Sequence, residues 1–156
     1  PAPALILASA SPSRRQLLAS AGFVFEVEPS GVDEDEVKRS LLGERAAPQA
    51  IAETLAELKA RRVSARHPSA MVIGADSTLA CNGRQFDKPP TLAAAREQLL
   101  ALAGQTHDLC SSVVVARAGV RLWHHNEQAR LTMRPFSDSF VDTYLARAGE
   151  AVKTSV

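Results

Sequence analysis

The chain has 156 residues, of which 46% are hydrophobic and 22% charged, a composition typical of one globular domain. Its net charge of +1 excludes the broad basic field of proteins that bind nucleic-acid polymers, and no apolar run approaches the ~20 residues that span a membrane. Cys81 and Cys110 lack metal-ligand spacing, so we predict reduced thiols in a cytoplasmic protein.

The N-terminal half of the chain alternates between strand and helix patterns. In chain order, these patterns predict a buried strand at residues 4–8, a helix that Ser11 and Pro12 begin and Gly22 ends, a strand at residues 23–28, an acidic turn at residues 31–36, and a helix at residues 48–66.

The C-terminal half starts with an apolar run that is compatible with a strand. The patterns predict a strand at residues 71–79, a hairpin turn at Asn82 and Gly83, a helix at residues 91–103, a buried strand at residues 109–116, a half-exposed strand at residues 128–134, and a last helix that Ser137 caps. Because strands and helices alternate early and a hairpin follows, we expect an α/β fold with a mixed sheet.

The first strand–turn–helix, LILASASPSRRQLL, is the clearest candidate for a binding site. A helix N-terminus offers free backbone N–H groups and a partial positive charge, and Ser9, Ser11 and Ser13 add hydroxyl groups. Arg14 and Arg15 lie in the first turn, where cations oppose the helix dipole, so a bound anion would resolve that conflict. The pattern also fits an ordinary capped helix with two solvated arginines.

Asp76 interrupts the apolar run MVIGADSTLA. Because burial of an unpaired carboxylate costs several kcal/mol, an acid in this setting is typical of a strand end, a metal site or a general base. The alternative is a structural aspartate that is hydrogen-bonded to a turn.

Lys59 is a third candidate, because it follows Ile51 and Leu55 on one helical face at i+4 spacing. The side chain is expected either to snorkel to the surface or to point into a cleft. A separate, solvated row is predicted on the same helix at Glu53, Glu57 and Arg61.

Two further charged residues complete the candidate set. Lys88 lies in FDKPP, where Pro89 and Pro90 stiffen the loop and restrict the position of the ammonium group. Glu34 is one of the acids in GVDEDE. Together with Asp76 it would suffice for Mg²⁺, which prefers a few carboxylates plus substrate phosphates and water.

Taken in order, these segments resemble the Maf family. The resemblance rests on LILASASPSRRQLL, VDE at 32–34, LKA at 58–60, GAD at 74–76, DKP at 87–89 and GQTH at 104–107, and it spans residues 1–156 as a single domain. It implies an ITPase-like α/β fold, with a mixed central sheet flanked by helices. It also implies a homodimeric nucleoside triphosphate pyrophosphatase that uses a divalent cation, Mg²⁺ or Mn²⁺, and releases a nucleoside monophosphate and pyrophosphate.

The resemblance assigns roles to individual residues. Asp76 matches the proton acceptor of the family and, together with Glu34, its metal site. The matching substrate-binding positions are Ser9, Ser13, Arg14, Arg15, Lys59, Ser77 and Lys88.

Two of these positions depart from the specificity motifs of the family. Ser13 stands where the pyrimidine-triphosphate branch has arginine and the 7-methyl-GTP branch tryptophan, and Ser77 stands where those branches have threonine and glutamine. The chain matches neither branch. Because a serine hydroxyl rotates and serves as donor or acceptor, we expect broader tolerance for the base than in either branch.

The family context adds one expectation and one alternative. Family members continue well past AVKTSV, so the C-terminal portion of the family domain is expected to be missing from this sequence. The family takes its name from inhibition of septum formation, so the alternative function is a non-catalytic, nucleotide-binding regulator of cell division. Neither function involves a nucleic-acid polymer or a membrane.

Overall fold

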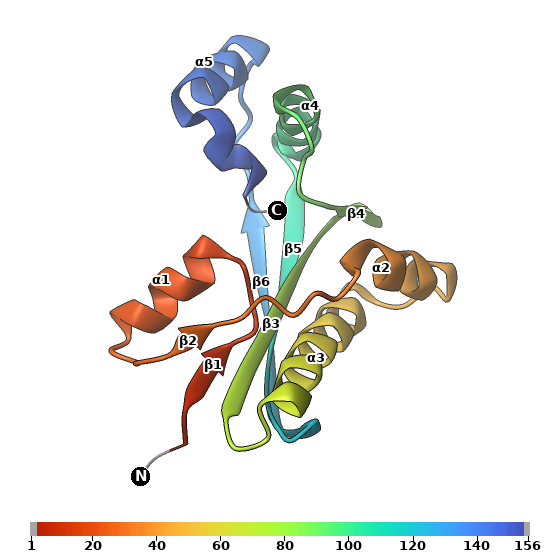
Figure 1. The fold of residues 1–156 in the computed structure, drawn as a ribbon. Helices are drawn as coiled ribbons and strands as arrows, with labels where there is room; N and C mark the ends of the chain where they lie inside the picture. Colours follow the sequence, from red (N-terminus) through yellow and green to blue (C-terminus); the bar gives the residue numbers. More distant parts are fainter. Residues whose placement is uncertain (1–2, 155–156) are drawn as a thin grey trace. The chain divides into compact units, whose positions relative to one another are not determined.

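The computed structural model describes residues 3–154. They form β1 (Leu5–Leu7), α1 (Pro12–Ser20), β2 (Glu26–Val27), α2 (Glu34–Gly43), α3 (Pro48–Arg66), β3 (Met71–Cys81), β4 (Arg84–Phe86), α4 (Leu92–Leu102), β5 (Thr106–Arg117), β6 (Val120–Thr132), α5 (Asp138–Ala148) and a 3₁₀ helix at Gly149–Lys153 (Figure 1). Two compact units result. Unit 1 contains the residues up to Asp76 and residues 111–127, and unit 2 contains residues 77–110 and those from 128 onward.

The sheet is mixed, which confirms the predicted α/β class. Its strand order is β2-β1-β3-β5-β6, with β4 beside β3. β1 pairs in parallel with both β2 and β3, whereas β3 and β4 are antiparallel. The predicted hairpin turn is confirmed, because Cys81 pairs with Arg84 across Asn82 and Gly83, whose φ angles are 51° and 76°. Among the described helices, none combines the length and the apolar character that a bilayer crossing requires.

The core of unit 1 is built between α3 and the sheet. Ala56 and Ala60 of α3 pack against Val114 and Ala116 of β5. Small side chains on α3 let the helix approach the sheet closely, and the closest approach is at Gly74 of β3. A Cβ atom on Gly74 would lie 2.2 Å from the carbonyl oxygen of Ala56 and 2.7 Å from the amide nitrogen of Ala60. Only glycine allows this contact between the two backbones.

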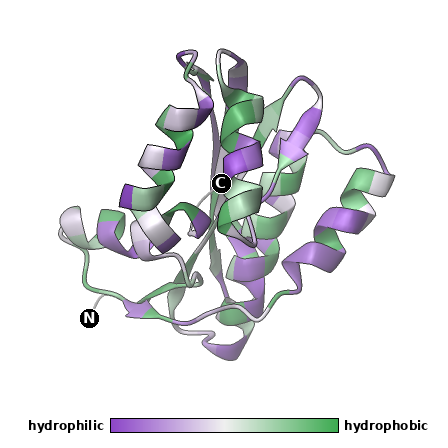
Figure 2. Cartoon of the chain, turned by 90° about the horizontal axis from the view of Figure 1, so that it is seen from above, coloured by the Kyte–Doolittle hydropathy of each residue, from purple (hydrophilic) through white to green (hydrophobic). Residues whose placement is uncertain are grey.

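Unit 2 has two apolar clusters. Ala95 of α4 packs with Val141 and Leu145 of α5, and a second cluster joins β3, β4 and α4 through Leu79, Cys81, Phe86 and Leu102. The helices carry hydrophobic and hydrophilic residues side by side, as is usual for helices with one face in the core (Figure 2). Cys81 and Cys110 are both buried free thiols, as predicted.

The acidic segment at residues 31–36 is not a turn, so that prediction is wrong. Asp33 caps α2, because its side chain accepts a hydrogen bond of 3.0 Å from the backbone N–H of Glu36. Glu34, Asp35 and Glu36 occupy the first turn of the helix, where negative charge interacts favourably with the helix dipole. Clustered acids at this position are a helix-start signal.

β6 begins well before the predicted residue 128. The turn Ala118–Gly119, with φ angles of 49° and 78°, joins it directly to β5. The first half of β6 has the sequence VRLWHHNE, which ends in four consecutive polar residues and so does not keep the apolar alternation of a half-buried strand. In the structure it is almost entirely exposed. It is hydrogen-bonded to β5 in the sheet, and polar contacts join it to α3.

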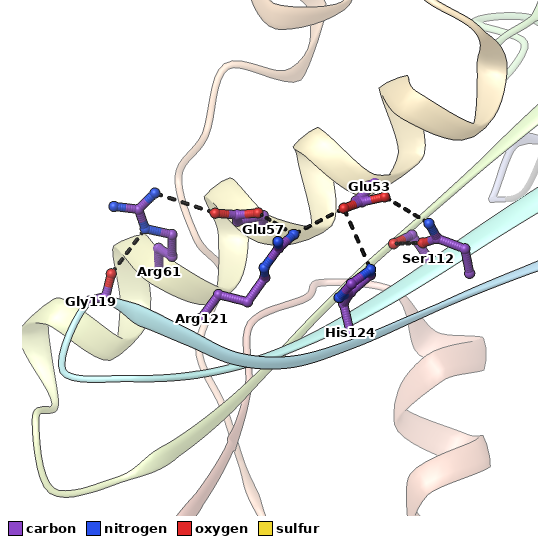
Figure 3. Close-up of polar contacts among 8 residues, drawn as sticks. Glu53, Glu57, Arg61, Ser112, Gly119, Arg121 and His124 are labelled. Carbon is purple, nitrogen blue, oxygen red and sulfur yellow. Dashed lines mark hydrogen bonds and ion pairs between the residues drawn. The ribbon is translucent and has the colours of Figure 1, made fainter.

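Glu53, Glu57 and Arg61 on α3 make those contacts. They were predicted to form a solvated row, and that prediction is incomplete. Arg121 donates to Glu53 and Glu57 at 2.9 Å each, and Asn126 donates to Glu53 at 2.7 Å. Arg61 donates to the carbonyl oxygen of Gly119 at 2.9 Å. These contacts fasten the β5–β6 hairpin to the outer face of α3 (Figure 3).

Replacement of Gly74 by alanine should destabilise the protein by about 3 kcal/mol, the upper end of the range for overpacked sites, because α3 has to move away from β3. The measurement is the free energy of unfolding in urea. Gly43→Ala is the matched control, since a Cβ atom at Gly43 meets nothing within 4 Å. That change should be neutral or stabilising by up to about 1 kcal/mol. Equal stability of Gly74→Ala and the wild type would contradict the close contact.

The hairpin network should give stability that depends on pH. The hydrogen bond from Asn126, with that from Arg121, holds the pKa of Glu53 below its usual range, against the opposing effect of partial burial. A lowered pKa in the folded state adds stability above the unfolded pKa of about 4.3, and that stability is lost as the pH falls through the folded pKa. Glu53→Gln should therefore lower Tm at pH 7, and the difference from wild type should shrink below about pH 4.3.

Glu97→Gln, on the exposed side of α4, serves as the control for this experiment and should follow the wild-type curve. A Tm difference between Glu53→Gln and the wild type that stays constant from pH 7 to pH 3 would show that the charge of Glu53 is not what binds the hairpin to α3.

Candidate active site

The turn between β1 and α1 gathers three of the predicted residues. Ser9 is buried, and its Oγ accepts hydrogen bonds from the backbone N–H of Ser11 at 3.2 Å and from Nη1 of Arg14 at 3.4 Å. Ser11 caps α1, since its Oγ accepts from the backbone N–H of Arg14, and it lies 2.9 Å from the Oγ of Ser13. The predicted helix start is therefore confirmed, with Ser9, Ser13 and Arg14 around it.

A pocket with a volume of about 560 Å³ opens beside this turn. Its lining includes Ser9, Ser11 and Arg15, and the first turn of α1 carries no acidic residue. Backbone N–H groups at a helix start, hydroxyl groups and a guanidinium group together favour an anion such as a phosphate group.

Sequence reasoning missed Gln16, which also lines this pocket. The signal was present in the helical spacing. Pro12, Arg15, Gln16 and Ala19 stand at i, i+3, i+4 and i+7, so they share one face of α1. The arginines thus separate, with Arg14 directed to Ser9 and Arg15 on the pocket face.

A second cluster joins three elements of unit 1. The Nζ atom of Lys59 lies 2.8 Å from Oδ1 of Asp76 and 2.9 Å from Oε1 of Glu34. The side chains of Lys59 and Asp76 are only 5% and 6% exposed, whereas that of Glu34 is 42% exposed. Lys59 therefore points inward from α3 and does not snorkel. The close contact of α3 with Gly74 brings the lysine within reach of Asp76.

Both clusters lie at the same end of neighbouring strands. β1 and β3 are parallel, with Leu7 opposite Ile73, and the backbone N–H of Ala8 donates to the carbonyl oxygen of Ile73 at 2.8 Å. Ser9 follows at the carboxyl end of β1, and Asp76 lies beyond Ile73 in the same direction. Ligands of α/β proteins bind outside the carboxyl ends of parallel strands, and both clusters lie toward that end of β1 and β3.

One oxygen of Asp76 is left for a ligand. Oδ1 is paired with Lys59, but within residues 3–154 Oδ2 is buried without a hydrogen-bond partner. Such an unsatisfied group costs about 1–3 kcal/mol unless something binds it. The oxygen is thus suited to a water molecule, a ligand or a cation.

A divalent cation would fit Glu34 and Asp76. In the described part of the chain, no group of three or more His, Cys, Asp or Glu side chains is placed to hold a metal ion. A pair of carboxylates suits Mg²⁺ or Mn²⁺, because such ions take their remaining ligands from substrate phosphates and water. The free Oδ2 of Asp76 is the observation that supports this fit.

Lys88 and Ser77 belong to unit 2, whereas the residues of the two clusters belong to unit 1. Lys88 is exposed in the loop after β4, and Gln98 of α4 donates to the carbonyl oxygen of Asp87 at 2.9 Å, which ties this loop to the helix. Ser77 is half-buried in β3 and directly follows Asp76, so its side chain leaves the strand on the opposite face. Their roles stay predictions.

Comparison with known proteins identifies the family of the chain. Residues 4–155 match the family model described as Maf-like protein. A nucleoside triphosphate pyrophosphatase of Paramagnetospirillum magneticum is 56% identical over 97% of this chain and 78% of its own length. A 7-methyl-GTP pyrophosphatase of Rhizobium etli is 46% identical over 99% of this chain and 77% of its own length.

A HAM1 protein from Coxiella burnetii has a TM-score of 0.49 to this chain, with 14% identity over 87% of this chain and 76% of that protein. The family model and the sequence relatives cover almost every described residue and show which family the chain belongs to. The chain belongs to the Maf family.

Proposed function

We propose that this chain is a nucleoside triphosphate pyrophosphatase, which hydrolyses its substrate to a nucleoside monophosphate and pyrophosphate. The observation that carries the proposal is the buried carboxylate of Asp76, whose Oδ1 is held by Lys59 and whose Oδ2 is free, at the same strand end as an anion pocket. The names of the relatives from Paramagnetospirillum magneticum and Rhizobium etli support the same reaction.

The phosphate groups are bound at the start of α1. Backbone N–H groups of the helix and the hydroxyl groups of Ser9 and Ser11 donate to phosphate oxygens, and Arg14 and Arg15 neutralise their charge. Lys88 adds a further cation, as the family resemblance implies. Charge that develops on the phosphate oxygens during the reaction is stabilised by the same groups.

Asp76 acts on the attacking water. Its Oδ2 accepts a hydrogen bond from the water and takes the proton as the oxygen attacks phosphorus. The bond between the α and β phosphates then breaks, and pyrophosphate leaves with the electron pair. Lys59 fixes the carboxylate through Oδ1, so Oδ2 keeps one orientation.

Glu34 and Asp76 would hold the divalent cation, Mg²⁺ or Mn²⁺, that we propose as the cofactor. Such a cation, when bound, supplies charge neutralisation for the phosphates and helps to orient the substrate. The two carboxylates would supply the oxygen ligands that Mg²⁺ and Mn²⁺ prefer, and substrate phosphates and water would supply the rest.

The base preference is proposed from the names of the relatives and from Ser13. The related proteins include one named nucleoside triphosphate pyrophosphatase and one named 7-methyl-GTP pyrophosphatase. Ser13 is exposed beside the pocket turn and hydrogen-bonded only locally among the described residues, to Ser11. We propose broad base tolerance on this ground. Location in the cytoplasm and a homodimer are further proposals that come from the family resemblance.

The deciding experiment is incubation of the protein with dTTP, UTP, CTP, GTP and 7-methyl-GTP, each with Mg²⁺ and with Mn²⁺. Release of pyrophosphate and monophosphate in equal amounts would support the proposed reaction, and the relative rates would give the base preference. Binding of these nucleotides without any pyrophosphate release would instead favour the non-catalytic regulator.

Asp76→Asn should reduce turnover by at least about a hundredfold, the usual contribution of a general base. Much of the nucleotide affinity should remain, because the amide retains the shape of the side chain and an oxygen that accepts from Lys59. Turnover is measured as pyrophosphate release, and the fold by circular dichroism. A folded Asp76→Asn protein with near wild-type turnover would remove Asp76 from its catalytic role.

Arg14→Ala and Lys88→Ala should weaken the binding of triphosphate by about 10- to 100-fold, since a hydrogen bond to a charged group is worth about 1.5–3 kcal/mol. Monophosphate should lose less, because it lacks the outer phosphates. Calorimetric titration of both nucleotides measures the effect, with the exposed Arg62→Ala of α3 as the control. Equal losses for the two nucleotides would show that these side chains do not bind the outer phosphates.

A further inference from the structure

The candidate metal site already contains a positive charge. The ammonium group of Lys59 lies between Glu34 and Asp76, at 2.9 Å and 2.8 Å from one oxygen of each. A divalent cation bound by the same two carboxylates would therefore lie close to this ammonium group. The two positive charges would repel each other in a place where water screens them poorly, because Lys59 and Asp76 are almost fully buried.

Lys59 is not free to move out of the way. It is on the buried face of α3 with Ile51 and Leu55, and its side chain is 5% exposed. The backbone of α3 is fixed against β3 at Gly74. The ammonium group thus stays beside the carboxylates whether or not a cation is present.

We propose that Lys59 keeps the affinity of Glu34 and Asp76 for a free divalent cation low, so that the cation enters the site together with the triphosphate. This inference rests on the proposed function, because it assumes the metal site described above. The negative charge of a triphosphate offsets the repulsion between the cation and Lys59, and its oxygens complete the coordination of the cation. Lys59 thereby couples the binding of metal to the binding of substrate.

The test is a titration of Mn²⁺ alone, without nucleotide, in which the free ion is measured by electron paramagnetic resonance. Lys59→Met and Lys59→Gln remove the charge, and both should bind Mn²⁺ at least about tenfold more tightly than the wild type. Lys59→Arg keeps the charge and should bind as weakly as the wild type. Lys153→Met, which removes a lysine of unit 2, is the control for net charge and should also match the wild type.

Equal Mn²⁺ affinity in the wild type and both neutral variants would overturn the proposal, and so would the absence of Mn²⁺ binding in all of them. The wild-type measurement is sufficient by itself if circular dichroism shows that the neutral variants do not fold. A micromolar dissociation constant of the wild type for Mn²⁺ would then overturn the proposal.

Failure of this proposal is distinguishable from failure of the proposed function. The titration uses no nucleotide and no turnover, whereas the proposed function fails only if the wild type releases no pyrophosphate from any triphosphate. A wild type that releases pyrophosphate, with neutral variants that bind Mn²⁺ no more tightly, would disprove the role of Lys59 alone.

Discussion

The contact between the backbones of β3 and α3 at Gly74 is the constraint on which the candidate site depends. A helix normally rests on a sheet through side chains, which keep the two backbones apart. Here a single Cβ atom would overlap the carbonyl oxygen of Ala56. The close approach lets Lys59 reach Asp76, which lies two residues beyond Gly74 on the same strand face. The packing of unit 1 and the charge pair are therefore one structural feature.

Different kinds of interaction hold the two faces of α3. The inner face is held by apolar side chains and by the Gly74 contact, which exclude water from Lys59 and Asp76. The outer face is held by exposed charges, with Glu53 and Glu57 sharing Arg121. Exposed pairs of this kind contribute little individually, but a guanidinium group that joins two carboxylates and a strand restricts how the helix can rotate. Rotation of α3 would move Lys59, so the outer network helps to fix the inner pair.

Much of this arrangement was predictable from local sequence, because local rules decide it. Ser11 and Pro12 mark the start of α1, and Asn82 and Gly83 form the hairpin turn. The i+4 spacing of Ile51, Leu55 and Lys59 places the lysine on a buried face of α3. Contacts between distant segments were not predictable in this way. The polar contacts between α3 and the first half of β6 are of this long-range kind. The start of α2 is a local signal that was wrongly assigned, because residues 31–36 were predicted as a turn, whereas Asp33 caps the helix and Glu34 begins it.

The charges at the starts of α1 and α2 provide a comparison within one chain. α2 begins with Glu34, Asp35 and Glu36, and negative charge at this position stabilises a helix. The N-cap and the charges in the first turn therefore both favour α2. α1 begins with Arg14 and Arg15 and has no acid in its first turn, which the same dipole disfavours. The helix dipole thus explains the acids at the start of α2 as a contribution to stability. It does not explain the arginines at the start of α1 in that way. A phosphate in the pocket beside Ser9 and Arg15, as proposed above, would reverse the sign of the interaction in α1, because its negative charge would lie at the positive end of the helix dipole and beside the arginines.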